Sequence, residues 1–334
     1  MFVIKTILKY LQFIFLPDRA FIPPFYLQVE TTNRCNFKCK MCSQSHPLFS
    51  PHLNTNDISL EEFKSILTRF PKTENVTLQG VGEPLLNPDI FGMIEHAHRA
   101  KKKVSLTTNG SLLTEENSKR ILESGLNRIM ISIDATTKDL YESIRPGGDF
   151  DLLLKNTKRL VELNGQKKKP MHIVCQTVML NENLEEIPKF PDLLRKLGIK
   201  NVFFSEIVVP PMEPVTSKPA HNIVKGLLDD LKKKTRNSGL SVFTLADFRP
   251  RKVPCFWLWG GVYITAEGLF SPCCMQPFPQ LLSLGNVFKD DFNKTWNSDI
   301  YKNARNAMKK RPLEPCRLVD CPFLAMWEDE RKRK

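Results

Sequence analysis

Short β-rich runs alternate with helix-length amphipathic stretches from residue 25 to about residue 204, and this alternation limits the possible folds more than any other feature of the chain. The expected strands cover residues 25–30, 75–79, 104–107, 128–133, 172–179 and 201–204. The expected helices cover residues 60–70, 88–100, 115–124, 152–164 and 184–197. Strands that alternate with helices in this way form βαβ units and a parallel sheet. We therefore predict an α/β fold of six such units, either a curved sheet or a partial (β/α)6 TIM-like barrel.

A cysteine-rich loop follows the first expected strand. Cys35, Cys39 and Cys42 have the spacing C-x3-C-x2-C and lie at the carboxyl end of that strand, the side on which β/α barrels build their active sites. Three thiolates hold three irons of a [4Fe–4S] cluster and leave the fourth iron without a protein ligand. Clusters that only transfer electrons normally have all four irons bound by protein. The spacing therefore predicts a cluster that binds a further ligand.

Polar and glycine-rich segments follow the later strands of the same expected sheet. Each of them alone is typical of an ordinary turn. Because the carboxyl ends of parallel strands meet at one edge, we expect them to lie together beside the cysteine loop and to bind a ligand with amino, carboxylate and hydroxyl groups. They are residues 80–84 (GVGEP), residues 107–110 (TTNG), Ser132, Asp134 and Arg145.

Taken in order along residues 25 to about 204, these motifs resemble those of the radical S-adenosylmethionine (SAM) superfamily. The resemblance implies that Cys35, Cys39 and Cys42 bind the cluster and that the amino and carboxylate groups of SAM bind its open iron. It also implies that one electron from the reduced cluster breaks a carbon–sulfur bond of SAM, and that the resulting 5′-deoxyadenosyl radical removes hydrogen from a substrate. An external donor such as flavodoxin or ferredoxin would supply the electron.

The resemblance also assigns SAM-contacting roles to residues outside the cysteine triplet. The residues expected to contact SAM are Gly82 and Glu83 at its amino group, Ser132 and Arg145 at its carboxylate, Asn109 near the ribose and Met41 near the adenine. Two positions depart from the family pattern: Met41 stands where an aromatic residue is frequent, and Val81 replaces the first glycine of Gly-Gly-Glu-Pro.

A second group of cysteines lies in the C-terminal part of the chain, around an expected hairpin with its turn at Glu267 and Gly268. This region is similar to the SPASM/twitch extensions of radical SAM enzymes, which implies one auxiliary [4Fe–4S] cluster. The expected ligands are Cys255, Cys273, Cys316 and Cys321, with Cys274 as the alternative to Cys273. Four thiolates also suit tetrahedral zinc, so a zinc site is the alternative that the spacing leaves open.

The expected organisation has four parts. An amphipathic N-terminal helix covers residues 1–20, the core domain covers residues 21–210, a linker with one helix covers residues 211–254, and the auxiliary-cluster domain covers residues 255–334. Cys175 lies in a strand-like run and is expected to be a small buried apolar residue.

The chain is basic, with 49 Lys and Arg against 36 Asp and Glu and a formal net charge of +13. Such an excess is compatible with nucleic acid, anionic lipid or an anionic substrate. The lysine runs are short and contain no interleaved aromatic residues, so they are typical of solvated helix ends and loops, and we expect no nucleic-acid partner. Two separate groups of thiols indicate metal sites in a reducing compartment, so we expect a cytoplasmic protein.

Residues 1–16 form a strongly apolar stretch in which Lys5, Lys9 and Gln12 recur on one stripe of an expected helix. Sixteen residues that include two lysines are marginal for spanning a bilayer. Two alternatives remain open at this point. The segment is either an interfacial helix, which would make the protein peripheral on the inner membrane face, or a structural helix that caps one end of the core.

The auxiliary cluster favours an oxidation, because the substrate radical must lose an electron. Asp134 and Glu206, both at strand ends, are candidates to accept a proton from the substrate, although rim salt bridges would look the same in sequence. Only 34 residues precede Cys35, which favours a small or membrane-associated molecule over a leader peptide. The alternatives are a peptide- or protein-modifying maturase and, in another class, a non-catalytic iron–sulfur electron carrier or metal-stabilised scaffold.

Overall fold

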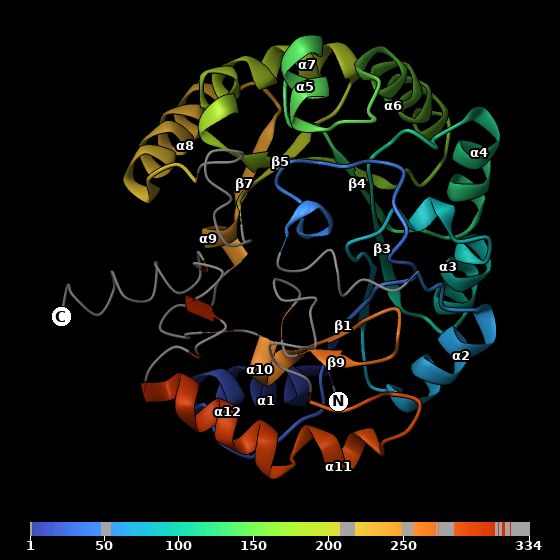
Figure 1. The fold of residues 1–334 in the computed structure, drawn as a ribbon, viewed down its shortest axis with the longest axis vertical. Helices are drawn as coiled ribbons and strands as arrows, with labels where there is room; N and C mark the ends of the chain where they lie inside the picture. The colour runs from blue at the N-terminus through green and yellow to red at the C-terminus, as the bar shows by residue number, and fades with distance from the viewer. Residues whose placement is uncertain are drawn as a thin grey trace.

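Among the residues that the computed structural model describes, nine strands form one continuous sheet, in the order β7-β6-β5-β4-β3-β2-β1-β8-β9 (Figure 1). Neighbouring strands are parallel except β8 and β9, which are antiparallel. The strands are β1 (Tyr26–Val29), β2 (Asn75–Leu78), β3 (Lys103–Thr108), β4 (Arg128–Ser132), β5 (His172–Met179), β6 (Asn201–Glu206), β7 (Ser241–Thr244), β8 (Gly261–Ile264) and β9 (Phe270–Ser271). The sheet curves inside a ring of helices, so the prediction of an α/β partial barrel is confirmed.

The structure describes residues 2–47, 55–207, 218–248, 255, 257–271, 273, 284–310, 313, 316–317 and 321. Within them, no helix is both long and apolar enough to cross a membrane.

The helices that follow the first strands cover the outer face of the sheet (Figure 1). They are α2 (Leu60–Arg69), α3 (Ile90–Arg99), α4 (Glu115–Glu123), α5 (Lys138–Ile144), α6 (Phe150–Gly165), α7 (Phe190–Leu197) and α8 (His221–Thr235). Their starts carry local signals, since Ser59 and Glu62 form a capping box at α2 and the Thr114 side chain caps α4. Alternate strand residues pack against these helices in one hydrophobic core, as Val76 and Leu78 do, so the residues between them face the inside of the barrel.

Two elements differ from the sequence-based expectation. Strand β7 lies in the segment expected to be a linker, where it pairs with β6 and extends the sheet. The helix expected over residues 184–197 is a 3-10 helix, η4 (Asn181–Lys189), followed by the shorter α7. Pro188 lies inside η4 and Pro191 at the start of α7, and because proline has no backbone N–H, a continuous α-helix is disfavoured here.

The C-terminal part joins the same sheet. The predicted hairpin is present as β8 and β9, with Gly268 in the left-handed region at φ 79°, and β8 pairs in parallel with β1. The short helices α10 (Trp257–Gly260) and α11 (Phe292–Trp296) and the longer α12 (Asp299–Lys310) surround it, and α9 (Leu245–Phe248) follows β7. The rings of Phe70 and Phe292, whose centroids are 4.2 Å apart, pack the end of α2 against α11. This packing buries apolar area between the two parts of the chain.

Candidate functional site

The cysteine loop follows β1 and is held by backbone hydrogen bonds to the end of α5. Lys38 N donates to Pro146 O at 2.9 Å, and Lys40 N donates to Ile144 O at 2.9 Å. Within the loop, Cys42 N donates to Cys39 O at 3.0 Å. Two segments that lie more than a hundred residues apart in sequence are therefore placed side by side.

The three thiols of the loop lie in largely apolar surroundings. Cys39 is buried and Cys35 and Cys42 are half-buried, all against a cluster that includes Phe37, Met41 and Ile144. Burial raises the pKa of Cys35 and Cys39 above the ordinary thiol value, and it raises the pKa of Cys42 to about 12. Cys39 also raises the pKa of Cys35, and both of them raise the pKa of Cys42, because the three thiols lie near one another. Thiolates in such surroundings need a bound cation to exist at neutral pH.

Glu83 joins the turns that follow β2 and β3. Its Oε1 accepts hydrogen bonds from Thr108 Oγ1 at 2.7 Å and Leu85 N at 3.1 Å, and its Oε2 accepts one from Asn109 N at 2.7 Å. Burial raises the pKa of Glu83 although these hydrogen bonds oppose the shift. The Glu83 carboxylate, which is predicted to contact the amino group of SAM, therefore accepts three hydrogen bonds within the chain that hold the turns after β2 and β3 together.

Asn109 extends this alignment to the cysteine loop. Its Nδ2 donates to Asn36 Oδ1 at 2.9 Å, and its Oδ1 accepts hydrogen bonds from Ser111 N at 2.9 Å and Ser111 Oγ at 2.7 Å. Asn36 Nδ2 in turn donates to Ser111 Oγ at 2.9 Å. The structure thus brings the predicted turn residues to the loop, as expected, and gives Asn109 partners within the chain.

Gly82 lies where no side chain fits. A Cβ atom built there would be 2.2 Å from Thr32 O and 2.7 Å from Arg34 O, both main-chain atoms of the segment that leads into the cysteine loop. Glu83 N also donates to Arg34 O at 2.8 Å. A glycine at this position is therefore required by the close approach of two backbones.

Arg145 and Asp134 form a buried ion pair beside the cysteine loop. Arg145 Nε and Nη2 each lie 2.6 Å from Asp134 Oδ2, and Arg145 Nη1 donates to Cys39 Sγ at 3.6 Å. Asp134 is fully buried, and its Oδ1 accepts a hydrogen bond from Val178 N at 2.8 Å. Both residues were predicted at the site, and the structure places them together, with Asp134 holding Arg145 rather than lining an open cavity.

The remaining predicted residues lie at the same end of the barrel. Ser132 ends β4 on its inner face, and Met41 packs in the apolar cluster around the thiols. Glu206 ends β6, and its Oε1 lies 3.1 Å from His221 Nδ1 at the start of α8. His221 was given no role from the sequence, because a lone histidine after a proline-rich segment carries no motif.

The sequence also missed Glu30, a fully buried carboxylate at the end of β1. Its Oε1 accepts a hydrogen bond from Val81 N at 2.7 Å, and its Oε2 accepts one from Ala266 N at 3.0 Å. Nearby, Asn33 Nδ2 donates to Glu267 Oε1 at 3.1 Å. Burial raises the pKa of Glu30 to about 7. The only sequence signal was an acidic residue that closes an otherwise apolar strand.

The four C-terminal cysteines expected to bind the auxiliary cluster gather near α10 and α12. Cys255 and Cys316 pack against one apolar cluster with Leu258, and Cys321 N donates to Cys316 O at 3.2 Å. Burial raises the pKa of Cys255 and Cys316, and Cys273 and Cys321 raise both further. Cys274, the alternative to Cys273, lies outside the described residues.

Among the described residues, no three His, Cys, Asp or Glu side chains converge tightly enough to hold a single metal ion. This finding concerns sites with one ion. In an iron–sulfur cubane each thiolate binds its own corner iron, so the ligands need not converge on one point. The donor set of the cysteine loop, three neighbouring thiols in an apolar shell beside a guanidinium, suits three corners of such a cluster.

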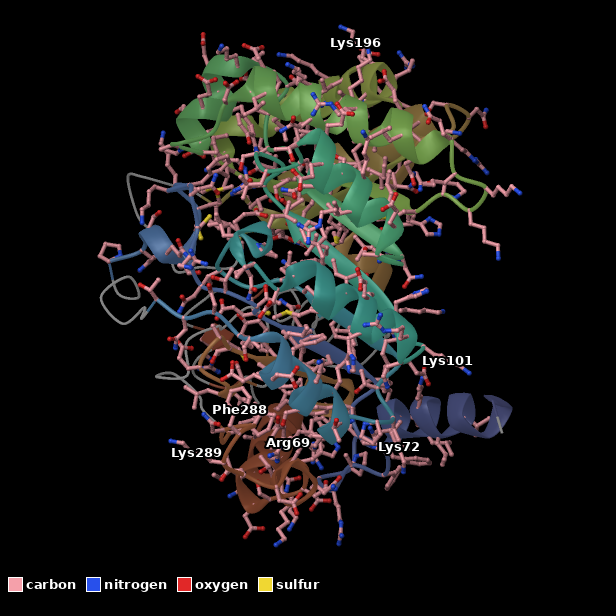
Figure 2. All side chains as sticks on the ribbon, turned by 90° about the vertical axis from the view of Figure 1, so that its right-hand side faces the viewer. Arg69, Lys72, Lys101, Lys196, Phe288 and Lys289 are labelled. Carbon is pink, nitrogen blue, oxygen red and sulfur yellow. The ribbon has the colours of Figure 1, made fainter. Side chains whose placement is uncertain are left out.

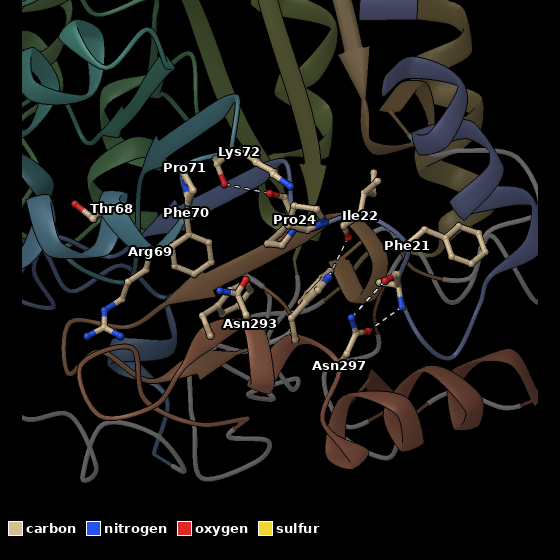
Figure 3. A pocket seen from close by; sticks show the side chains of 15 residues that line it. Phe21, Ile22, Pro24, Thr68, Arg69, Phe70, Pro71, Lys72, Asn293 and Asn297 are labelled. Atoms are coloured by element: carbon tan, nitrogen blue, oxygen red, sulfur yellow. Dashed lines mark hydrogen bonds between the residues drawn. The ribbon is translucent and has the colours of Figure 1, made fainter. Parts of the chain in front are cut away.

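A cavity of about 330 Å³ lies at the opposite end of the strands, where Pro24 precedes β1 and Thr73 precedes β2 (Figure 3). Asn297 and Trp296 hold the N-terminal segment on one wall, since Asn297 Oδ1 accepts a hydrogen bond from Ala20 N and Trp296 Nε1 donates to Ile22 O. Because the cysteine loop follows the carboxyl end of β1, this cavity is separate from the candidate site.

Two family models match the chain. Residues 29–194 match the radical SAM superfamily, and residues 255–322 match the iron–sulfur cluster-binding domain SPASM. The first match contains the cysteine loop, Glu83, Asn109 and Arg145, and the second contains the C-terminal cysteines.

Relatives align along most of the chain. The antilisterial bacteriocin subtilosin biosynthesis protein AlbA of Bacillus subtilis is 25% identical over 320 residues, which are 92% of this chain and 67% of AlbA. The tungsten-containing aldehyde ferredoxin oxidoreductase cofactor-modifying protein of Pyrococcus furiosus is 27% identical over 323 residues, 89% of this chain and 86% of that protein. The crystal structure of Streptococcus suis SuiB bound to precursor peptide SuiA shares the fold, with a TM-score of 0.71 at 16% identity over 90% of this chain and 70% of SuiB.

Proposed function

Because this chain belongs to the radical SAM superfamily and carries a SPASM iron–sulfur cluster-binding domain, we propose that it oxidatively modifies a peptide. The observation that carries this proposal is the chemistry of the inner face of the barrel, which presents amide and hydroxyl groups below the cysteine loop. The backbone of a peptide offers the complementary N–H and C=O groups.

The inner-face positions alternate with the strand residues that pack against the helices. Apolar side chains such as Met130 and Val174 share this face with polar ones. The polar side chains at these positions include Gln28, Thr77, Gln79, Thr107, Ser132 and Gln176. Thr107 Oγ1 donates to Gln79 Oε1 at 2.8 Å, and Gln28 Nε2 donates to Gln79 O at 3.1 Å, so part of this face is held in place by its own hydrogen bonds. Gln176 Oε1 is buried and has no hydrogen-bond partner in the described part of the chain. A substrate N–H would satisfy it.

Cys35, Cys39 and Cys42 would hold the SAM-binding cluster, and Cys255, Cys273, Cys316 and Cys321 would hold the auxiliary cluster. When bound, the reduced cluster and SAM supply one-electron chemistry that removes a hydrogen atom from a substrate, and the auxiliary cluster supplies an acceptor for the second electron. The chain itself positions these groups. Glu83 and Asn109 align the turns around the loop, and the apolar shell of Phe37, Met41 and Ile144 excludes water from the thiols.

The relatives support a peptide substrate. AlbA is named for the biosynthesis of a bacteriocin, and SuiB is bound to a precursor peptide. Both align with nine-tenths or more of this chain. On this proposal, the substrate peptide lies along the inner polar face with the reacting residue next to the cysteine loop.

A small or membrane-associated molecule is the second candidate substrate. The relative from Pyrococcus furiosus is named as a cofactor-modifying protein and aligns over 89% of this chain. A non-catalytic electron carrier, the alternative from another class, predicts no SAM cleavage at all.

The test uses the anaerobically reconstituted full chain with dithionite, SAM and synthetic peptides encoded beside its gene. We expect release of 5′-deoxyadenosine together with a peptide that has lost a pair of hydrogen atoms, both by mass spectrometry. Cys35→Ala is the negative control, and 5′-deoxyadenosine no higher than in this variant would refute SAM cleavage. Gln176→Leu should raise the KM for the peptide without lowering SAM cleavage in its absence. If neighbouring small molecules are modified while every peptide returns unchanged, the substrate proposal is wrong.

A further inference from the structure

Two polar residues of the N-terminal helix α1 (Phe2–Phe15), Lys9 and Gln12, contact the rest of the protein. Gln12 is fully buried, its Nε2 donates to Trp259 O at 2.5 Å, and its Oε1 accepts hydrogen bonds from Phe21 N at 2.6 Å and Ile22 N at 3.0 Å. Lys9 Nζ lies 2.7 Å from Glu74 Oε2 and 4.6 Å from the centre of the Phe25 ring. Phe13 packs on the same inward side, against the cluster of Leu258 and Trp259. The inward side of α1 is therefore partly polar, whereas an amphipathic helix on a soluble domain normally turns a continuous apolar stripe inward.

The exposed side chains of α1 whose positions the structure describes are apolar. Ile7, Leu11 and Ile14 recur at the spacing of one helix face, and Ile7 is 50% and Ile14 52% exposed. Leu8 and Phe15 flank this face and are 36% and 66% exposed. Five of the eight exposed large apolar side chains in the described part of the chain lie between residues 7 and 21, Phe21 among them. Such a concentration marks an interaction surface rather than scattered exposure.

Basic residues border this apolar face. Glu74, the partner of Lys9, accepts a hydrogen bond from Lys103 N at 2.9 Å through its main-chain oxygen, and Lys102 Nζ donates to Pro71 O and Thr73 O. The turn at residues 101–103 and the segment 71–74 are therefore packed together next to α1. Lys72, Lys101 and Lys103 are exposed on them. Figure 2 shows α1 projecting from the body with Lys72 and Lys101 beside its base and Lys196 at the far end of the molecule.

We propose that this N-terminal surface, formed by the outer face of α1, Phe21, Lys72, Lys101 and Lys103, binds the surface of an anionic bilayer. Its apolar side chains would enter the boundary between headgroups and acyl chains, and its lysines would contact anionic headgroups. A second copy of the chain is the less suitable occupant, because pairing the two surfaces would bring like charges together in a protein of net charge +13. The cysteine loop lies at the other end of the strands and stays accessible. The proposal does not depend on which substrate the enzyme modifies.

The reconstituted full chain is mixed with vesicles of phosphatidylcholine alone or with added phosphatidylglycerol and separated by flotation. We expect binding to the anionic vesicles, weakening as salt is raised, and little binding to the neutral ones. Ile14→Glu should reduce binding more than about tenfold, whereas Ile223→Glu, at an equally exposed isoleucine of α8, should not. Lys101→Glu with Lys103→Glu should also reduce it more than about tenfold, whereas the equally charged double change Lys196→Glu with Lys200→Glu should have a smaller effect.

Iron content and melting temperature check that the variants fold, and Ile14→Glu should leave both unchanged because its side chain points outward. The proposal is overturned if the unmodified chain fails to float with anionic vesicles, or if Ile223→Glu lowers binding as much as Ile14→Glu. It is also overturned if the chain elutes as a dimer that Ile14→Glu separates while vesicle binding is absent, since a second copy would then cover this surface.

Discussion

The guanidinium of Arg145 connects Asp134 to Cys39. Two of its nitrogens lie 2.6 Å from the carboxylate, and the third donates to the sulfur at 3.6 Å. All three side chains are buried, so little water screens the guanidinium from the sulfur. Burial lowers the pKa of Arg145, but the negative charges of Asp134 and Cys39 outweigh this effect and raise it further above its already high value. A permanent positive charge is therefore held beside a predicted cluster ligand.

This charge should favour reduction of the cluster in the cysteine loop, because the added electron increases the negative charge next to Arg145. We expect Arg145→Gln to lower the reduction potential by an amount on the order of 100 mV. Lys40→Gln is the matched control, since it removes one positive charge from the same loop at a half-exposed position where water screens it. Redox titration followed by electron paramagnetic resonance measures the reduction potential of the cluster in both variants. Equal changes of this potential in Arg145→Gln and Lys40→Gln would contradict the argument.

The ion pair of Arg145 with Asp134 should also stabilise the folded protein. Arg145→Gln leaves the Asp134 carboxylate buried without its cation and should lower the free energy of unfolding by about 3–5 kcal/mol. Changing Asp134→Asn together with Arg145→Gln removes both charges and should restore most of the loss. Anaerobic thermal melting compares the three proteins. A double variant no more stable than Arg145→Gln alone would show that the unpaired carboxylate is not the cause.

Gly82→Ala should displace the turn that follows β2. The added Cβ would lie 2.2 Å from Thr32 O and 2.7 Å from Arg34 O, which are main-chain atoms and cannot move away as a flexible side chain could. We expect a lower melting temperature and SAM binding weakened at least about tenfold, measured by equilibrium dialysis. Gly226→Ala in α8 is the control, because nothing lies within 4 Å of its built Cβ. It should raise stability by about 0.5–1 kcal/mol, as expected for alanine in a helix.

Cys255→Ala and Cys35→Ala should remove different clusters. We expect each variant to lose about half of the iron of the intact protein, because each affects one four-iron site. Cys255→Ala should retain slow release of 5′-deoxyadenosine without substrate, whereas Cys35→Ala should not. Metal analysis after anaerobic purification gives the iron count. Bound zinc together with only one cluster of iron in the unmodified chain would show that the C-terminal site is the zinc alternative.

Local patterns were sufficient to predict the first six strands, most of the helices and the residues that meet at the cysteine loop. The reason is that these signals depend only on residues close together in the sequence. They are the alternation of strand residues, the capping box of Ser59 with Glu62 and the glycine turns. The order of a parallel sheet then places those turns at one edge without further information. Arg145, Asn109 and Glu83 were found in this way, and only their partners had to come from the structure.

The parts that could not be predicted depend on distant contacts. Strand β7 has four residues and is recognisable only by its pairing with β6, and β8 joins β1 across more than two hundred residues of sequence. For Gln12 the sequence predicts only a place on a polar stripe of a helix, because its partners, Trp259 O and the amides of Phe21 and Ile22, are brought to it by the folded chain. Glu30 likewise belongs to no sequence motif, because its two hydrogen-bond partners, Val81 N and Ala266 N, come from turns that are distant in the sequence.

Glu30 should make stability depend on pH. Its folded-state pKa of about 7 lies above the unfolded value of 4.5, so the folded protein binds the proton more tightly. The stability that this proton contributes is complete below pH 4.5 and is lost as pH rises through 7, by about 3 kcal/mol in all. Glu30→Gln cannot titrate, and its single carbonyl oxygen cannot accept from both Val81 N and Ala266 N, which adds a penalty independent of pH. The unmodified chain should therefore lose stability relative to Glu30→Gln between pH 5 and 8 in anaerobic melting. Glu267→Gln, which keeps the Glu30 carboxyl, should retain that slope, and a constant difference between the unmodified chain and Glu30→Gln would contradict the assignment.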